Sequence, residues 1–321
     1  MWCARNSPKF AIFKLLNHCN MGRSVHYIPQ YYLRGFTDPE SPKDQEPYLW
    51  VYEFESRSWK KRAPKNVASK KDFYILIDEE GRRREEIEKA LSTLESKAAS
   101  IFRNKIQIME RLNHEERAII AEFIATMMTR VPKFHYETDS FISEIAEFEM
   151  RMIEGSPDKV KELKEQYEKE TGDKLPEGFG PSDFDPSRYK ISATKSFLLD
   201  MMLSPIREAR NIIYRMTWTF LHTIGQARFI TSDSPYFMLN PKSPRNGQGL
   251  LHQGIKVSLP FSSKICLLAD WGKTAQRHIN ISDETADLKV VEVFNRLRIE
   301  GADKFIISCK RGFIGVQKLP K

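Results

Sequence analysis

The sequence LWVYEFESRSWKKRAPKNVASKKDFYIL, residues 49–76, predicts three short strands joined by polar turns. Leu49, Val51 and Phe54 approximate the two-residue apolar repeat of a strand. The polar residues ESRS follow as a turn, WKKRA as a returning strand and DFYIL as a third strand. We therefore expect a small antiparallel sheet near the start of the chain.

Long helical patterns follow this sheet. The apolar spacing over residues 84–106 predicts one helix, and residues 112–132 predict a second, with Asn113 as its N-cap and Pro132 at its end. A charged helical stretch covers residues 136–171 and is interrupted at EGSPDK. The middle of the chain is therefore expected to be helical.

The last third of the chain returns to strands. Residues 192–216 indicate a helix, and the alternation in residues 216–239 predicts a hairpin that turns near Gly225. GIKVSLPF and KICLLAD are expected strands, followed by a closing helix over residues 283–303 and a last strand, KFIISC. Because strands and helices are segregated, the predicted class is α+β, with antiparallel sheet elements at both ends of the chain around a central helical region.

The same pattern predicts the domain organisation. Residues 25–308 are expected to form a single domain with a helical insertion at about 136–187, and residues 309–321 a C-terminal strand and tail. Residues 1–24 are expected to be a tail of doubtful authenticity, because Met21 offers another translation start just before the patterned region. Mass mapping of the N-terminal peptide tests this expectation.

The composition is that of a globular protein with a basic balance of charge. The 321 residues include 51 Lys and Arg against 43 Asp and Glu, which gives a net charge of +8. This charge favours polyanionic partners such as nucleic acid, although it can also serve solubility alone. No apolar run approaches the roughly 20 residues that span a bilayer, so no membrane partner is expected. The four cysteines, Cys3, Cys19, Cys266 and Cys309, show no CxxC spacing. This pattern favours free thiols and a cytoplasmic location.

The segment HYIPQYYLRGF, residues 26–36, is the first candidate for chemistry. A histidine titrates near neutral pH, so His26 is a candidate general acid or base, and Arg34 can hold a phosphate or carboxylate. Gln30 lies four residues from each of them and is a candidate for substrate binding. The alternative is that His26 and Arg34 only satisfy buried backbone carbonyls while the apolar side chains anchor the segment: Tyr31, Tyr32, Leu33 and Phe36.

The segment FITSDSPY is the second candidate, because it places polar side chains at the end of a predicted strand. Asp233 could orient His26 or hold a divalent metal ion, with Thr231 and Ser232 contacting the substrate. The alternative is a turn in which Asp233 or a serine caps the strand. Asn295 could also orient a substrate; the alternative is that it bonds a neighbouring loop while Arg296 and Arg298 are solvated.

Carboxylates on the two predicted helices could also form a metal site. Glu88 and Glu95 are seven residues apart, and Glu122 and Arg130 are eight apart, which is roughly 10 to 12 Å along a helix. This separation is too long for either pair to hold one ion, so salt bridges between the helices are the preferred interpretation. Tyr74 is expected to be a core aromatic residue with a hydrogen-bonded hydroxyl.

A basic and aromatic stretch surrounds Trp59 and Phe73. Its cations could hold a nucleic-acid backbone while its rings stack on bases, although a charged edge hairpin that prevents strand addition has the same composition. The usual motifs of dinucleotide, P-loop, zincin and serine-hydrolase sites are absent from the sequence. The candidate nucleic-acid-binding residues are Lys60, Lys61, Arg62, Lys65, Lys70 and Lys71.

Six separated blocks of the sequence occur in this order: HYIPQYYLRGF, LWVYEFESRSWKKRAPKNVASKKDFY, IEKALSTLESKAA, ERAIIAEFIATMMTRVPKF, FITSDSPYF and FNRLRIEGADKFIIS. With these blocks the chain resembles a bacterial family catalogued as domain of unknown function 4238. The resemblance extends from His26 to Ser308 and implies no assigned reaction.

Two functional hypotheses remain open. In the first, the protein is an enzyme that cleaves phosphodiesters in nucleic acid or nucleotides, with His26 and Asp233 as catalytic residues and Arg34 on the phosphate. In the second, it is a non-catalytic regulatory module whose helical insertion binds a protein partner and whose small sheet binds nucleic acid. Whether the two polar segments meet in one cavity distinguishes these hypotheses.

Overall fold

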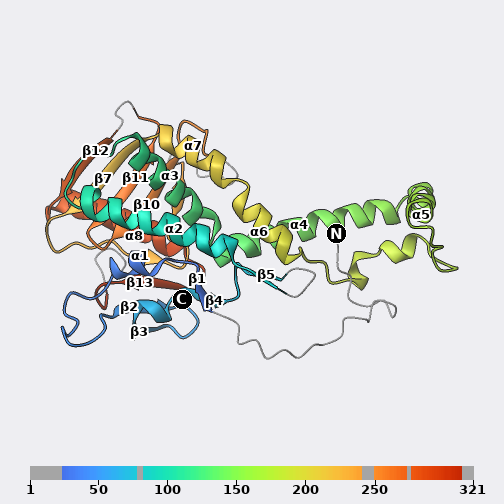
Figure 1. Ribbon diagram of the computed structural model, residues 1–321, viewed down its shortest axis with the longest axis horizontal. Helices are drawn as coiled ribbons and strands as arrows, with labels where there is room; N and C mark the ends of the chain where they lie inside the picture. Colours follow the sequence, from blue (N-terminus) through green and yellow to red (C-terminus); the bar gives the residue numbers. More distant parts are fainter. Residues whose placement is uncertain (1–23, 78–81, 241–248, 273–275, 313–321) are drawn as a thin grey trace. The chain divides into compact units, whose positions relative to one another are not determined.

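The computed structural model describes residues 24–77, 82–240, 249–272 and 276–312 (Figure 1). The fold is α+β, as predicted, with strands towards both ends of the chain and helices in the middle. The chain forms two compact units. We call residues 135–201 the helical unit, and the unit that contains residues 22–134 and 202–321 the main unit.

The predicted N-terminal hairpin is present in the main unit. Strands β2 (Leu49–Glu53) and β3 (Ser58–Arg62) pair antiparallel around the expected polar turn. The prediction of a third strand at DFYIL was wrong: residues 72–74 form a turn that begins with Asp72 at φ 53°, and only Leu76 belongs to a strand, β5 (Leu76–Ile77). β5 pairs with β6 (Arg83–Arg84).

The hairpin belongs to a four-stranded sheet whose other strands come from the last third of the chain. Its order is β3-β2-β13-β8, where β13 is Phe305–Ser308 and β8 is Thr231–Ser232. A cluster of Tyr52, Ile230, Ile299 and Ile306 forms the core against this sheet. The two ends of the described chain are therefore joined by β pairing.

A five-stranded sheet forms the centre of the main unit. Its order is β12-β7-β11-β10-β9, and the pairing of β12 with β7 is parallel whereas the other pairings are antiparallel. The sheet includes the two strands predicted at GIKVSLPF and KICLLAD, but β12 was not predicted. The bounds are β7 Thr217–Thr223, β9 Phe237–Leu239, β10 Lys256–Ser262, β11 Ile265–Asp270 and β12 Gln276–Ile281.

The hairpin predicted over residues 216–239 was wrong. β7 is buried along its whole length and lies between β11 and β12, whereas β8 pairs with β13 in the other sheet. The connection near Gly225 is held by Asp283, whose carboxylate accepts a hydrogen bond from the Gln226 backbone N–H at 2.8 Å. Long-range pairing therefore overrides the local alternation of this segment.

Helices cover both faces of the five-stranded sheet (Figure 1). Phe220 and Leu221 are consecutive in β7 and point to opposite faces. On the first face, Phe261 contacts both Phe220 and Phe123 of α3. On the second, Leu221 packs in a cluster with Val291 of α8.

The predicted helices of the main unit are present. α2 (Glu86–Ile101) continues into a π-helical turn, η2 (Phe102–Ile106), and α8 (Thr285–Gly301) precedes β13. α3 (His114–Thr129) begins with Asn113, which forms a capping box with Glu116. The single helix expected over residues 192–216 is instead two helices, α6 (Lys195–Leu203) and α7 (Ile206–Arg215), and α7 packs against α3.

The helical unit contains most of α4 (Pro132–Glu154), α5 (Pro157–Thr171), the short turns η3 (Pro181–Phe184) and η4 (Pro186–Arg188), and most of α6 (Lys195–Leu203). The expected interruption at EGSPDK separates α4 from α5. No helix among the described residues has the length and apolar character needed to cross a membrane.

Candidate functional site

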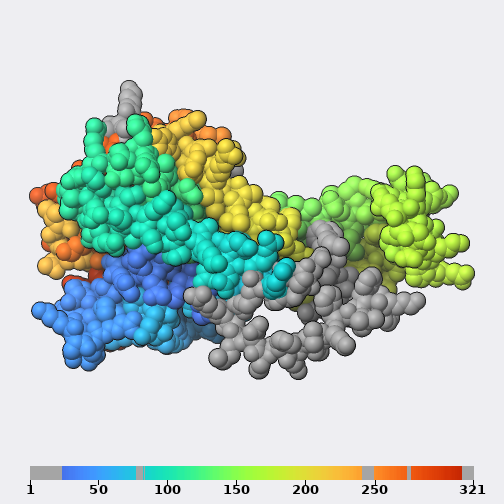
Figure 2. Space-filling model, in the orientation of Figure 1, coloured from blue at the N-terminus to red at the C-terminus, as the bar shows by residue number. Residues whose placement is uncertain are grey.

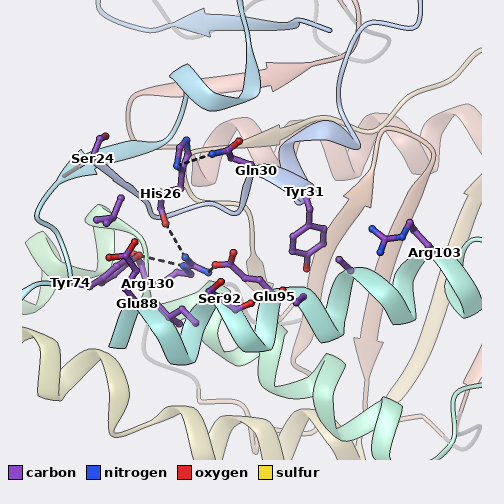
Figure 3. A pocket seen from close by; sticks show the side chains of 14 residues that line it. Ser24, His26, Gln30, Tyr31, Tyr74, Glu88, Ser92, Glu95, Arg103 and Arg130 are labelled. Carbon is purple, nitrogen blue, oxygen red and sulfur yellow. Dashed lines mark hydrogen bonds and ion pairs between the residues drawn. The ribbon is translucent and has the colours of Figure 1, made fainter. Parts of the chain in front are cut away.

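A polar cavity of about 540 Å³ opens in the main unit beside residues 24–31. Strand β1 (Ser24–His26), which pairs with β4 (Ser69–Lys71), contributes to one side together with α1 (Gln30–Arg34), and α2 contributes the opposite side (Figure 3). On the face shown in Figure 2, the blue N-terminal segment adjoins the teal helices. The site thus joins segments that are about 60 residues apart in the sequence.

Arg130, which follows α3, links the elements around the cavity. It is buried, and its guanidinium donates to Glu95 Oε1 at 2.7 Å and to the backbone oxygen of His26 at 2.9 Å. The hydroxyl of Tyr74 donates to the Arg130 backbone oxygen at 2.9 Å, which confirms the expectation for Tyr74. Because a guanidinium stays protonated, Arg130 neutralises the Glu95 carboxylate in this wall.

His26 lines the cavity at the end of β1. Its Nε2 lies 3.1 Å from the Lys65 carbonyl oxygen, which can only accept, so Nε2 carries the proton in the neutral ring. Nδ1 is then an acceptor, 3.5 Å from the amide nitrogen of Gln30. Burial lowers the pKa of His26 below its ordinary value of 6.5. His26 is therefore neutral at pH 7, with its lone pair on Nδ1.

Tyr31 lines the cavity, and its hydroxyl bonds none of the residues that the structure describes. Its ring packs on Phe123 with the centroids 5.8 Å apart, and its oxygen is buried with no hydrogen bond to any residue that the structure describes. In Figure 3 this hydroxyl points towards α2, between Glu95 and Arg103. Burial raises the pKa of Tyr31 well above 10, so the group remains a donor.

Arg103 lies at the edge of the cavity on the π-helical turn η2. Its side chain is exposed, and within residues 24–77, 82–240, 249–272 and 276–312 no ion pair or hydrogen bond engages its guanidinium. π-Helical turns occur frequently at functional sites. Arg103 is thus a cation available to a ligand of this cavity.

The acidic residues of α2 do not form a metal cluster with the other described residues. Glu88 and Glu95 both line the cavity, but Glu95 pairs with Arg130, and Glu122 lies 3.6 Å from Arg210 of α7. Across the described ranges, no group of three or more His, Cys, Asp or Glu side chains is placed to hold a metal ion. The preference for helix-to-helix salt bridges is confirmed for Glu95 with Arg130, whereas Glu122 has a different partner.

Asp233 is not among the residues that line the cavity of His26. Its buried carboxylate accepts hydrogen bonds from the backbone N–H groups of Asp303 at 2.9 Å and Lys304 at 2.6 Å. Burial raises the pKa of Asp233 to about 6, despite these hydrogen bonds. These hydrogen bonds show that Asp233 stabilises the turn between α8 and β13.

The other candidates of the second segment also have internal partners. Thr231 Oγ1 lies 2.9 Å from the Tyr32 hydroxyl, and both side chains are buried. The Ser232 hydroxyl donates to the Ser234 backbone oxygen at 2.8 Å, which forms a local turn. Neither Thr231 nor Ser232 lines the cavity.

Asn295 also bonds a neighbouring loop, as the alternative interpretation expected. Its Oδ1 accepts from the Ile230 N–H at 3.0 Å and its Nδ2 donates to the Arg228 carbonyl at 2.9 Å. The expectation that both adjacent arginines are solvated was wrong for Arg298, which is buried and donates to Ser258. Asn295 does not line the cavity of His26.

The segment HYIPQYYLRGF divides between anchoring and cavity residues. Tyr32, Leu33 and Phe36 are buried, as expected for anchors, whereas Gln30 lines the cavity. Arg34 is exposed and is not among the lining residues. The cation at the cavity edge is therefore Arg103, which the sequence analysis did not select.

The basic stretch lies on β3, on β4 and on the connection between them. Lys60 and Arg62 both pair with Glu53, and Lys65 lies 2.6 Å from Glu46. These carboxylates offset part of the positive charge of the stretch. The six candidates are Lys60, Lys61, Arg62, Lys65, Lys70 and Lys71.

Lysines also cover the aromatic rings of this region. The Lys61 ammonium lies 4.2 Å from the centroid of Tyr48 and 5.0 Å from that of Trp50, and Lys70 lies 5.1 Å from that of Phe73. A base that stacks on these rings would have to displace the lysines. The surface therefore resembles a charged edge hairpin as much as a stacking platform.

Tyr31 and Arg103 are the residues that sequence reasoning missed. Tyr31 was assigned an anchoring role, and its ring does pack on Phe123, but the residue also lines the cavity. Arg103 belongs to the predicted helix over residues 84–106, where nothing in the pattern distinguishes it from a solvated arginine. The only available signal was that Arg103 is close to the end of that helix, where the π-helical turn occurs.

Comparison with known proteins supports the resemblance found in the sequence. No curated protein and no solved structure matches this chain. A family model described as "Protein of unknown function (DUF4238)" matches residues 25–312, which is nearly the whole chain. The chain therefore belongs to the DUF4238 family.

Proposed function

We propose that the protein is a phosphate-directed hydrolase that cleaves phosphodiesters in nucleic acid or nucleotides, and that the cavity beside His26 is its active site. The observation that carries this proposal is that one polar cavity combines a neutral histidine, His26, with an arginine that pairs with none of the described residues, Arg103. A neutral imidazole can accept a proton, and a guanidinium can bind a phosphate oxygen.

The proposed reaction uses water as the nucleophile. The water oxygen attacks phosphorus while one water proton passes to Nδ1 of His26, and the bond between phosphorus and the leaving oxygen breaks. The protonated His26 then returns this proton to the leaving oxygen, so the imidazole ends in its starting state. Gln30, whose amide lies 3.5 Å from Nδ1, is proposed to turn to the substrate when it binds, which leaves the Nδ1 lone pair free to accept the water proton.

Arg34 and Asp233 do not have the roles that the sequence predicted for them. Arg103 replaces Arg34 as the phosphate-binding cation, because Arg103 lines the cavity and Arg34 does not. Asp233 is left out of the reaction, since its carboxylate accepts hydrogen bonds from the turn at Asp303 and Lys304. His26 keeps its proposed role in proton transfer.

The distribution of charge supports a polyanionic substrate for the main unit. Residues 135–201 contain 9 Lys and Arg against 16 Asp and Glu, so the helical unit is acidic although the whole chain has a net charge of +8. The remaining residues therefore have a larger positive excess than the whole chain. Such an excess of positive charge attracts nucleic acid and nucleotides at distances up to about a Debye length.

The experiment is to incubate the full chain with end-labelled RNA and DNA and with nucleotides that contain a phosphodiester, with and without a chelator. We expect cleavage of at least one substrate. The chelator arm shows whether a divalent ion takes part. Intact substrates together with no measurable binding of nucleic acid would contradict the proposal.

A non-catalytic binding module is the second candidate, because helix α4 exposes large apolar side chains at helical spacing. Phe141, Ile145, Phe148 and Met152 are between 40% and 64% exposed. Such a row is typical of a face that binds a protein partner. This candidate would be favoured if the wild-type protein hydrolyses no substrate but forms a complex with a partner protein, and if Phe148→Glu abolishes that complex.

We also propose a cytoplasmic location. Cys266 and Cys309 are buried free thiols, and burial raises the pKa of Cys266 to about 11. Unreactive thiols of this kind are compatible with a reducing compartment. Fractionation of cells that express the full chain, followed by detection of the protein, tests the location.

A further inference from the structure

We infer that Tyr31 and Arg103 form a subsite for a terminal phosphate group, so that the cavity accepts the phosphorylated end of a nucleotide or strand in preference to the interior of a strand. This inference rests on the proposed function for the choice of a phosphate-containing substrate. It adds where the terminal phosphate of such a substrate binds, beside the phosphodiester that is cleaved, and which residues select it.

The hydroxyl of Tyr31 can donate a hydrogen bond to an acceptor atom of the ligand. Tyr31 lines the cavity, its oxygen is buried and directed towards α2, and no described residue accepts its hydrogen bond (Figure 3). Charged side chains act on it from two sides, with Glu95 and Arg130 on one side and Arg103 on the other. A ligand oxygen that reaches Tyr31 therefore lies between two guanidinium groups.

The charges around this position favour an anionic ligand oxygen. Glu95 is 2.7 Å from Arg130, so its negative charge is offset within the wall. Glu88 also lines the cavity, but it is not among the charges that act most strongly on Tyr31. Arg103 has no partner in the described part of the chain, and its charge is therefore open to the ligand. A doubly charged phosphate monoester gains more from this field than a singly charged diester does.

The size of the cavity also favours binding of the end of a strand over binding of its interior. About 540 Å³ lies within the range of pockets that enclose a small molecule. The interior of a strand needs a groove that continues in both directions along the backbone. A terminal phosphate with its nucleoside needs only one opening.

The lining also contains neutral groups that suit the rest of a nucleotide. Ser92 and Gln30 present hydroxyl and amide groups to the cavity, and Leu91 and Ala99 present apolar surface. Hydroxyl and amide groups can bond sugar hydroxyls or base edges, while apolar surface can pack on a base. These contacts would distinguish a nucleoside phosphate from free phosphate.

Calorimetric titration of the full chain tests the subsite directly. The probes are adenosine 5′-monophosphate, ribose 5-phosphate, inorganic phosphate and adenosine. We expect the monophosphate to bind and adenosine to bind at least about 10-fold more weakly, because adenosine lacks the charged acceptor. The relative affinities of the phosphate and sugar phosphate show how much the nucleoside contributes.

Two variants assign the interaction to the named residues. Tyr31→Phe and Arg103→Gln should each weaken monophosphate binding by about 10-fold or more. Tyr48→Phe and Arg111→Gln are the matched controls, since neither residue lines the cavity, and both should bind like wild type. An unfolding curve for each variant verifies that it folds.

The outcomes separate this inference from the proposed hydrolysis. Binding that is weakened in Tyr31→Phe and Arg103→Gln supports the subsite, even if no substrate is cleaved. Equal binding of adenosine and its monophosphate, or unchanged binding in both variants, overturns it. Cleavage by a protein that fails to bind any monophosphate also overturns the subsite and leaves the hydrolase proposal standing.

Discussion

The guanidinium of Arg130 lies 2.7 Å from the Glu95 carboxylate, and this ion pair joins the end of α3 to the middle of α2 in the wall of the cavity. The arginine side chain is 2% exposed and that of Glu95 is 23% exposed. The same guanidinium holds the backbone oxygen of His26. The ion pair therefore supports both the fold and the position of the proposed base.

Glu95→Gln should lower the free energy of unfolding by about 2–4 kcal/mol, because it leaves the buried Arg130 without its carboxylate. Urea denaturation of the variant and of wild type measures this difference. Glu300→Gln is the matched control, since Glu300 pairs with Arg296 at 3.9 Å on the surface. The control should change stability by at most about 0.5 kcal/mol, and an equal loss in both variants would argue against a special role for the buried pair.

The neighbouring tyrosines Tyr31 and Tyr32 should respond in opposite ways to loss of their hydroxyls. Tyr32→Phe removes a buried hydrogen bond to Thr231 and should cost about 1–2 kcal/mol of stability. Tyr31→Phe removes a hydroxyl that lacks a described partner, so stability should stay constant or rise by up to about 1 kcal/mol. Thermal and urea unfolding check both values, and a large loss in Tyr31→Phe would show that its hydroxyl has a structural partner.

Asp233 should make stability depend on pH in the acidic range. Its folded pKa is about 6, above the ordinary 3.8, so between these values the folded state binds more protons than the unfolded state. The free energy of unfolding should therefore fall as pH rises through this window, by about 2–3 kcal/mol from this group.

Asp233→Asn should remove that component, because an amide does not titrate. Urea unfolding at several pH values between about pH 4 and 7 compares the slopes of the two proteins. Asp44→Asn makes the same change of charge at an exposed position and serves as the control. Identical slopes in wild type and Asp233→Asn would show that this carboxylate has the same pKa in the folded and unfolded chains.

The proposed hydrolysis should retain its rate in mildly acidic solution. Because burial lowers the pKa of His26, the acid limb of the pH profile of kcat/KM should have its midpoint below 6.5. Above this midpoint the imidazole is neutral and can accept the proton. A midpoint above 6.5 would indicate that a different group acts as the base.

The helices were predictable from local sequence. The apolar spacing of residues 84–106 and the Asn113 cap suffice to locate α2 and α3, because both signals act within a few residues. The strands β7 and β8 could not be assigned to different sheets in this way. Their partners lie about 40 to 75 residues away, and local alternation contains no information on such pairing.

Part of the candidate site was also predictable. His26 and Gln30 were selected as polar residues within an aromatic segment, and both line the cavity. The proximity of Asp233 to the Asp303 turn, and the absence of a described partner for the Tyr31 hydroxyl, depend on residues distant in the sequence. Such relationships become visible only when the chain is folded.

The cleavage rate of His26→Gln tests the central claim most directly, with the substrate and metal conditions under which the wild-type protein is active. We expect a loss of at least about 100-fold, because the base for the attacking water is gone, while the melting temperature stays close to that of wild type. His114→Gln is the control: His114 is exposed, bonds Tyr214 at 2.7 Å, and should leave the rate unchanged. Equal rates for wild type and His26→Gln would contradict the assignment of this cavity as the active site.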